Sequence, residues 1–323
     1  MYSEYVDIEM FIQMHIAKEA TQSSKIEGTQ TNIEEAFLKK VDISNDRKND
    51  WEEVQNYISA MNKAVKLLYT LPFSARLIKQ THKVLLQGVR GQYKLSGEFR
   101  RSQNWIGGAT INDAVFVPPA HMSVADYISD IEKFANNDEF DIPDLIKVAL
   151  IHYQFETVHP FLDGNGRVGR LLITLYLVSK GILKQPVLYL SDFFEKNRMY
   201  YYDNLMRVRT HNDINQWLKF FLTGVIETAK KGVETFNSIL LLQKSVDRSL
   251  EKMGKRSADA HLVMHYLYKK PVISVAVVTN IIGKTQQTAY TLISDLEEAK
   301  ILHEITGLQR NKLYAFRDYI NLF

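Results

Sequence analysis

Residues 159–170 read His-Pro-Phe-Leu-Asp-Gly-Asn-Gly-Arg-Val-Gly-Arg, and they bring an imidazole, a carboxylate, three glycines and two guanidinium groups into twelve residues. Gly164 and Gly166 allow backbone conformations closed to other residues, so their N–H groups can approach a ligand closely. At the start of a helix, such N–H groups form an anion site that the helix dipole reinforces. Arg167 and Arg170 are three residues apart, so both can meet phosphates from neighbouring positions on that helix.

The other polar residues of this stretch are suited to bind a metal ion, to donate a hydrogen bond and to accept a proton. Asp163 is a hard oxygen ligand of the kind that magnesium takes together with substrate phosphates. Asn165 can donate a hydrogen bond to a phosphate oxygen, and His159 can take up a proton near neutral pH. Taken singly, each has an ordinary explanation, such as a loop histidine or an Asp-Gly-Asn-Gly turn. Their combination predicts a cradle for nucleotide phosphates with a base beside it.

Two other known motifs fit the same residues poorly. Gly164, Gly166 and Gly169 match the G-x-G-x-x-G dinucleotide fingerprint, but that motif needs a preceding strand within a βαβ unit. A helical pattern and a His-Pro loop precede it here, so the sequence argues against a Rossmann fold. An EF-hand does not fit either, because Arg167 and Val168 fill positions that need a ligand and a glycine.

Most of the remaining sequence has the three- and four-residue apolar spacing of helices. The expected helices lie at residues 8–20, 51–71, 143–158, 166–181, 200–209, 215–230 and 233–253. Residues 105–119 break this pattern, because a Gly-Gly pair lies there among aromatic and β-branched residues. That combination predicts a short β-hairpin.

A different order of elements follows residues 252–257, a polar stretch typical of a linker. The pattern predicts a helix from residue 258, a short helix at 274–282, a turn at Gly283 and Lys284, a helix at 285–300, and strands at 301–305 and 312–316. This succession is that of a winged helix-turn-helix. The sequence therefore predicts an N-terminal helical region at 1–75, a helical core with flanking helices at 76–252, and a winged-helix module at 254–323.

The composition narrows the class of protein. The 323 residues include no cysteine, which excludes disulfides and a cysteine nucleophile. The sequence has no stretch near the roughly 18 apolar residues of a membrane helix, and its first residues show no secretory signal. We therefore expect a soluble, cytoplasmic protein. The formal net charge of +3 is too small to indicate a nucleic-acid partner.

Residues 159–170 resemble the Fic family signature, His-Pro-Phe-x-Asp/Glu-Gly-Asn-Gly-Arg-x-x-Arg, at every position. The resemblance extends from about residue 76 to about residue 209. It implies a mainly α fold, a Fic-type helical bundle that binds ATP with Mg²⁺ and transfers AMP to a Tyr, Thr or Ser hydroxyl of a target protein. It also implies that His159 deprotonates the hydroxyl, Asp163 anchors the magnesium and Arg170 grips the γ-phosphate. The other positions that it assigns to the nucleotide are Gly164, Asn165, Gly166, Arg167, Val168 and Gly169.

In the same resemblance, the hairpin corresponds to the family's flap, which clamps the target segment by strand pairing. Backbone pairing fixes the register of the target segment but recognises little of its sequence. The flap positions here are Trp105, Ile106, Gly107 and Gly108. A structural hairpin that packs Trp105 and Phe116 into the core fits the same pattern. Asn197, Tyr201 and Tyr202 resemble the residues that line the adenosine, although aromatic residues at helical spacing often belong to a core.

Residues 23–28, Ser-Ser-Lys-Ile-Glu-Gly, resemble the Ser/Thr-x-x-x-Glu-Gly/Asn motif of Fic inhibitory helices. The resemblance makes Ser23, Glu27 and Gly28 inhibitory residues. Glu27 would pair with Arg170, so ATP could still bind while its γ-phosphate lacks its partner. The ordinary alternative is an exposed carboxylate at a helix end beside a capping glycine.

The C-terminal module argues against DNA as the partner. Its predicted recognition helix at 285–300 is net acidic, whereas DNA affinity depends on neutralising phosphates. We expect this module to dock a protein or to dimerise; self-modification and a homodimer stay open. The favoured function is an autoinhibited protein adenylyltransferase. The alternatives are a Fic-type enzyme with another donor or with AMP-removing activity, and a DNA-binding regulator that uses the Fic body as a nucleotide sensor.

Overall fold

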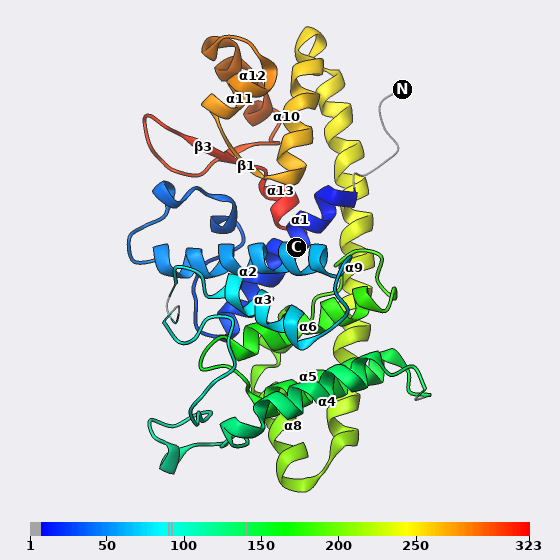
Figure 1. Cartoon of the computed structure of the whole chain (residues 1–323). Coiled ribbons are helices and arrows are strands. Elements are labelled where there is room, and N and C mark those ends of the chain that lie inside the picture. Colours follow the sequence, from blue (N-terminus) through cyan, green and yellow to red (C-terminus); the bar gives the residue numbers. More distant parts are fainter. Residues whose placement is uncertain (1–7, 90, 92, 140) are drawn as a thin grey trace. The chain divides into compact units, whose positions relative to one another are not determined.

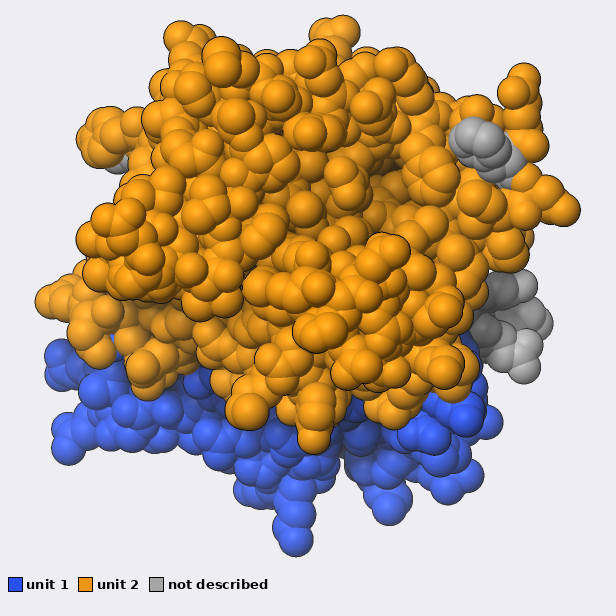
Figure 2. Space-filling model, turned by 90° about the horizontal axis from the view of Figure 1, so that it is seen from below, with its two compact units in different colours: residues 1–18, 32–44, 230–323 blue, residues 19–31, 45–229 orange. Residues whose placement is uncertain are grey.

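The computed structural model describes residues 8–89, 91, 93–139 and 141–323, and these residues are mainly helical with a small sheet (Figure 1). The predicted mainly α class is confirmed. The chain divides into two compact units whose segments alternate along the sequence (Figure 2). The first unit holds the described part of residues 1–18 together with 32–44 and 230–323, and the second holds 19–31 and 45–229. The predicted boundaries near 75 and 252 stay a prediction.

The second unit is a set of helices. They are α2 (Lys48–Leu67), α3 (Ala75–Leu85), α4 (Val124–Asn136), α5 (Asp144–Val158), α6 (Asn165–Ser179), α7 (Ser191–Lys196) and α8 (Arg198–His211). The C-terminal part of α1 (Ile8–Ile26) and the N-terminal part of α9 (Ile214–Glu251) belong to the same unit. A short 3-10 turn of this unit lies at His121–Ser123, and the turns at Glu35–Phe37 and Lys40–Asp42 belong to the first unit.

Helix α6 lies in the core of this unit. Most of its side chains are buried, among them Leu171, Leu172, Leu175 and Tyr176. A helix that is buried on all sides is a core helix, and α6 packs against α2, α3 and α5. Because residues 165–170 form its first turns, half of the motif is anchored in this buried helix.

Helix α9 differs from the expectation. The sequence pattern places two helices at 215–230 and 233–253, but a single helix of 38 residues runs from Ile214 to Glu251 (Figure 1). A glycine such as Gly232 costs a helix interior about 1 kcal/mol relative to alanine. Buried apolar side chains, including Phe221 and Ile239, continue on both sides of Gly232. Their packing outweighs the local penalty, and the predicted break is wrong.

The predicted hairpin at 105–119 is also less regular than expected. Ile106 and Phe116 form an isolated antiparallel bridge, and a 3-10 turn at Ile111–Asp113 lies between them. The Asp113 carboxylate accepts backbone N–H bonds from residues 109 and 110 at 2.8 and 2.6 Å. Such local side-chain bonds compete with a strand ladder, so the segment is a loop with one bridge. Trp105 is 40% exposed, so the alternative in which it packs into the core does not hold for this residue.

The C-terminal segment has the predicted order of elements with two additions. It contains α10 (Ser257–Lys269), β1 (Val272–Ser274), α11 (Val275–Ile282), α12 (Gln286–Glu298), β2 (His303–Glu304), β3 (Leu313–Ala315) and α13 (Arg317–Ile320). The strands form an antiparallel sheet in the order β1-β3-β2. Strand β1 and helix α13 were not expected, and the assignment to the winged-helix class stays a prediction. Among the described residues, no helix combines the length and apolarity that crossing a membrane requires.

Candidate active site

The loop between α5 and α6 carries the histidine of the motif. His159 follows the last residue of α5 and has a left-handed backbone, with φ 48° and ψ 60°. The next residue is proline, which disfavours a further helical residue before it. The His159 carbonyl accepts hydrogen bonds from Arg100 Nε and Asn104 Nδ2, both at 3.0 Å. These two donors hold a strained conformation that would otherwise cost of order 1 kcal/mol or more.

The loop closes on itself through Asn165. Its Oδ1 accepts the Phe161 N–H at 2.8 Å, and its Nδ2 donates to the Phe161 carbonyl at 2.8 Å. The side chain is almost fully buried. The sequence predicts that this amide donates a hydrogen bond to a phosphate oxygen, whereas in the structure its oxygen and its nitrogen both bond to Phe161.

His82, on α3, contacts the loop at Asp163 and Phe161. Its Nδ1 accepts the Gly97 N–H at 2.9 Å, so its Nε2 carries the proton and donates to the Asp163 carbonyl at 3.0 Å. Its ring stacks on Phe161 with the centroids 3.7 Å apart. Burial lowers the pKa of His82 to about 4, so the ring is neutral at physiological pH. The sequence analysis did not single out this residue.

The Asp163 carboxylate faces open space between two cations. Lys94 Nζ lies 3.5 Å from one of its oxygens and Arg167 Nη2 lies 3.6 Å from the other. The Asp163 side chain is 29% exposed. The described residues contain no group of three or more His, Cys, Asp or Glu side chains that could hold a metal by themselves. A single accessible carboxylate fits a magnesium ion that arrives with nucleotide phosphates and keeps several of its waters.

These residues line a cavity of about 560 Å³. The predicted site residues in its wall are Glu27, Trp105, Ile106, Gly107, His159, Asp163, Gly164, Asn165, Gly166, Arg170, Tyr201 and Tyr202. All of them belong to the second unit. Residue 27 and residues from the stretches 94–115, 156–170 and 201–209 therefore meet at one cavity.

Other predicted residues lie outside the wall, and their contacts explain why. The Val168 side chain is fully buried in the core, and a Cβ on Gly169 would collide with the Glu156 carboxylate. The Asn197 amide donates to the Phe193 carbonyl at 3.0 Å, at the junction of α7 and α8. Arg167 is paired with Glu53 of α2. The remaining residues outside the wall are Ser23, Gly28 and Gly108.

The imidazole of His159 is buried and neutral near physiological pH. Burial lowers its pKa to about 4, with Glu27 opposing that effect, so the ring is neutral near pH 7. Its Nδ1 has no hydrogen-bond partner among the described residues. A neutral imidazole beside a phosphate cradle can accept the proton of an incoming hydroxyl.

Arg170 is bound to the helix that carries the predicted inhibitory residues. Its Nη2 donates to Glu27 Oε1 at 2.7 Å and to the Ser23 carbonyl at 2.8 Å, and its Nε donates to Ser23 Oγ at 2.8 Å. The guanidinium is buried. Burial acts to raise the pKa of Glu27, but the attraction of Arg170 outweighs it and the pKa lies below its ordinary value. The carboxylate is therefore ionised and paired.

Gly166 makes room for this carboxylate. A Cβ at residue 166 would collide with Glu27 Oε1. Gly166 is the second residue of α6, where unpaired backbone N–H groups and the helix dipole favour an anion. The Glu27 carboxylate therefore lies against the first turn of α6, in the space that the absent side chain of Gly166 leaves.

Tyr201 and the buried carboxyl group of Glu156 also line the cavity. Tyr201 is almost fully buried, and its hydroxyl donates to His152 Nε2 at 2.9 Å while His152 Nδ1 donates to the Gly169 carbonyl at 3.0 Å. Burial lowers the pKa of His152 to about 3 and raises the pKa of Glu156 to about 7. Glu156 Oε1 has no hydrogen-bond partner among the described residues.

The predicted flap is fastened to α8. The Ile106 N–H donates to the Phe116 carbonyl at 2.9 Å, and the Phe116 N–H donates back at 3.1 Å. The Arg209 guanidinium lies 3.9 Å from the centre of the Phe116 ring, and its Nη2 donates to the Glu156 carbonyl at 3.1 Å. Arg209 thus connects the flap to the end of α5, three residues before His159.

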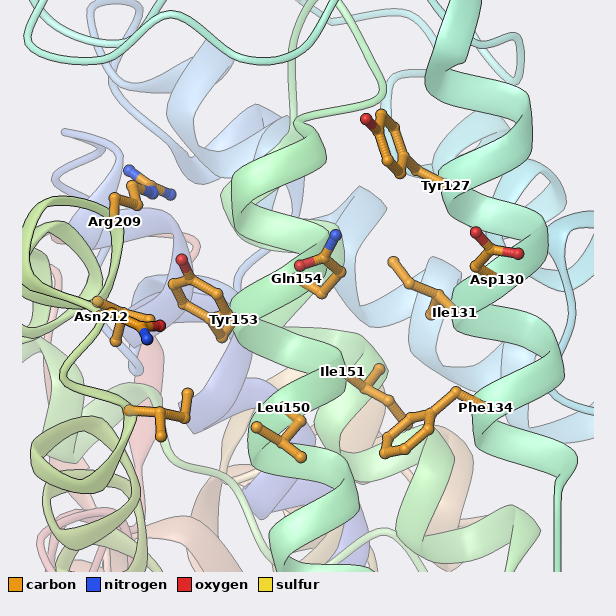
Figure 3. A pocket seen from close by; sticks show the side chains of 12 residues that line it. Tyr127, Asp130, Ile131, Phe134, Leu150, Ile151, Tyr153, Gln154, Arg209 and Asn212 are labelled. Atoms are coloured by element: carbon orange, nitrogen blue, oxygen red, sulfur yellow. The ribbon is translucent and has the colours of Figure 1, made fainter. Parts of the chain in front are cut away.

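A second hollow, of about 730 Å³, lies between α4, α5 and α8 (Figure 3). Tyr127, Asp130 and Phe134 line it from α4, and Tyr153 and Gln154 from α5. It contains none of the site residues predicted from the sequence. Arg209 lines both cavities.

Comparisons of sequence agree with this geometry. Residues 72–177 match the model of the Fic/DOC family, and residues 1–66 match the model of the Fic/DOC family N-terminal region. The chain is similar to proteins named "Protein adenylyltransferase Fic" from Aedes aegypti, with 34% identity over 125 residues, and from Drosophila yakuba, with 30% identity over 125 residues. Each match covers 38% of this chain and 22% of the relative, so the chain spans about a fifth of those proteins.

Comparisons of structure show the fold. A crystal structure of a Fic family protein from Desulfovibrio desulfuricans has a TM-score of 0.59 at 17% identity, covering 94% of this chain and 86% of that one. A Fic domain-containing signaling protein from Bacteroides thetaiotaomicron has a TM-score of 0.58 at 19% identity, covering 71% of this chain and 89% of that one. Since the two family models together span more than half of the sequence and the fold is that of solved Fic proteins, the chain belongs to the Fic/DOC family.

Proposed function

We propose that this chain is an autoinhibited protein adenylyltransferase, which transfers AMP from ATP to a Tyr, Thr or Ser hydroxyl of a target protein. One observation carries the proposal: His159, Asp163, the first turn of α6 and Arg170 line a single cavity, and the Arg170 guanidinium is held by Glu27. The first part of this arrangement supports the transfer, and the second part supports its inhibition.

The arrangement suits attack on the α-phosphate. His159 would take the proton of the target hydroxyl, whose oxygen would bond to the α-phosphorus as the bond to the β-phosphate oxygen breaks and pyrophosphate leaves. A magnesium ion on Asp163 would neutralise charge on the phosphates. The N–H groups of the first turn of α6 and the released Arg170 would hold those phosphates in place. Such catalysis depends on positioning and charge stabilisation.

Inhibition follows from the position of Glu27. Its carboxylate lies beside Gly166 in the first turn of α6 and accepts a hydrogen bond from Arg170 Nη2. A γ-phosphate at this position would meet a negative charge and lack its cationic partner, so bound ATP would be misaligned for attack. Relief of inhibition therefore requires Glu27 to leave Arg170.

The test is incubation with α-labelled ATP and magnesium, alone and with a cell lysate. We compare the wild type, Glu27→Gly, and Glu27→Gly combined with His159→Ala. We expect label on protein in Glu27→Gly, little in the wild type, and none when His159 is also replaced.

Failure has a distinct form. If no variant labels itself or the lysate while ATP still binds, the transfer of AMP is excluded, and another donor, the reverse reaction or a sensing role becomes the better account. If the wild type labels as fast as Glu27→Gly, the enzyme stands but the inhibition does not.

A further inference from the structure

Arg167 lies in the first turns of α6 between two carboxylates. Its Nη1 donates to Glu53 Oε2 of α2 at 2.9 Å, and both side chains are almost fully buried, with 5% and 7% exposed. Its Nη2 lies 3.6 Å from Asp163 Oδ1, and its Nε has no hydrogen-bond partner among the described residues. The guanidinium is therefore bonded to Glu53 and lies just outside hydrogen-bond distance of Asp163.

These contacts do not favour direct binding of phosphate by Arg167. The residue does not line the cavity. It can reach a nucleotide only by leaving Glu53, and separating a buried ion pair leaves an uncompensated charge in the core. Asp163, in contrast, lines the cavity and has an accessible carboxylate. Of the two groups, Asp163 is the one that a ligand can meet.

We propose that Glu53 is a positioning residue for the metal site: by holding Arg167, it keeps that guanidinium from closing on Asp163 and leaves the carboxylate available to a divalent cation that arrives with the nucleotide. The inference rests on the proposed function, because it needs Asp163 to hold the metal. Groups that orient a metal ligand commonly change metal affinity by 10- to 100-fold when they are removed.

Removal of the Glu53 charge has a defined consequence. Arg167 would keep Asp163 as a carboxylate neighbour, four residues earlier in sequence and already 3.6 Å away, together with the attraction of Glu27. A closed Arg167–Asp163 pair would occupy an oxygen that the metal needs. Replacing both Glu53 and Arg167 by apolar residues removes this buried competitor and leaves the exposed Lys94 as the other cation beside Asp163. A buried ion pair often tolerates such a replacement.

The experiment measures Mn²⁺ binding to the full chain by electron paramagnetic resonance, with α,β-methylene-ATP as a nucleotide that cannot donate AMP. The variants are Asp163→Ala, Glu53→Gln, Glu53→Asp, and Glu53→Leu combined with Arg167→Met. Glu98→Gln, which removes the surface pair between Glu98 and Lys79, is the matched control. Binding of the nucleotide in EDTA is measured alongside, and circular dichroism checks the fold.

We expect Glu53→Gln to weaken Mn²⁺ binding by roughly tenfold without changing nucleotide binding in EDTA, and the double variant to recover most of the loss. Glu53→Asp, which keeps the charge, should lie between Glu53→Gln and the wild type, and it takes the place of Glu53→Gln if that variant does not fold. The control should bind like the wild type.

Three results would overturn the inference. One is unchanged Mn²⁺ binding in the Glu53 variants while Asp163→Ala loses it, which leaves the proposed function intact. Another is a double variant that binds nucleotide more weakly than Glu53→Gln in EDTA, because Arg167 would then be a phosphate ligand itself. The third is equal Mn²⁺ binding by Asp163→Ala and the wild type, which would remove the metal site from the proposed function as well.

Discussion

Replacement of Glu27 by glutamine tests the inhibitory contact with the smallest change in shape. Glutamine keeps the length of the side chain and removes the charge that Arg170 Nη2 contacts at 2.7 Å. A hydrogen bond to a charged group contributes about 1.5–3 kcal/mol. Because the Glu27 side chain is 35% exposed, solvent screens the pair, and the lower figure applies. A loss of about 1.5 kcal/mol raises the ratio of released to inhibited protein roughly tenfold.

The rate of AMP transfer should rise by that same factor as long as the released form is the minor one. The assay is the initial rate of incorporation of labelled AMP, with binding of α,β-methylene-ATP measured in parallel. Glu195→Gln is the matched control, because Glu195 of α7 forms an ion pair at 3.0 Å with Lys25, which lies on α1 two residues before Glu27. Exposed pairs contribute at most about 1 kcal/mol, so this variant should change the rate much less.

The reasoning fails if Glu27→Gln stays within about twofold of the wild-type rate while the nucleotide still binds. It also fails if Glu195→Gln activates as strongly, because the effect would then belong to general loosening of α1.

Two further predictions concern the base and the flap. In Glu27→Gly, the rate of AMP transfer should stay level from about pH 8 to about pH 5 and fall at lower pH. The reason is that burial lowers the pKa of His159 to about 4 and only the neutral ring accepts a proton. A midpoint near pH 6.5 in the pH–rate profile would contradict this prediction. Arg209→Ala removes the guanidinium that lies over Phe116, so it should speed hydrogen exchange at the Ile106 and Phe116 amides by roughly tenfold. Arg209→Lys should speed this exchange less. Equal exchange rates in the two variants would refute the contribution of the contact.

The sequence predicts the local parts of the site well. Residues 159–170 specify a loop and a helix start by their own glycines, proline and polar groups, and the structure brings most of them to one cavity. Glu27 and Arg170 are 143 residues apart, and their contact was predicted by resemblance to a known motif. Composition and spacing alone would not have paired them.

The supporting residues could not be predicted in the same way. Glu53, His82 and Arg209 are single polar residues on helices, and nothing in their neighbours distinguishes them from residues on a solvated face. Their roles depend on contacts across long sequence separations, such as the 114 residues between Glu53 and Arg167. A weak clue exists for His82, because a histidine on the apolar side of an amphipathic helix must find a buried partner.

The flap shows a different limit. Its aromatic and β-branched residues favour strands, and the expectation of a hairpin followed from them. The carboxylate of Asp113 instead bonds to the neighbouring backbone, which replaces ladder bonds by a local turn. Side-chain competition of this kind depends on geometry that composition does not contain.

The room that Gly166 leaves for Glu27 has a genetic consequence. A side chain at residue 166 would displace the Glu27 carboxylate, and in the proposed mechanism it would also crowd the phosphates at the start of α6. Alleles at that position should therefore be null even though they disrupt the inhibitory contact. Gain-of-function alleles should arise instead at Ser23 on α1 and at Glu27, which directly follows that helix. Selection can thus adjust the strength of inhibition from one side of the contact, while the other side stays fixed by catalysis.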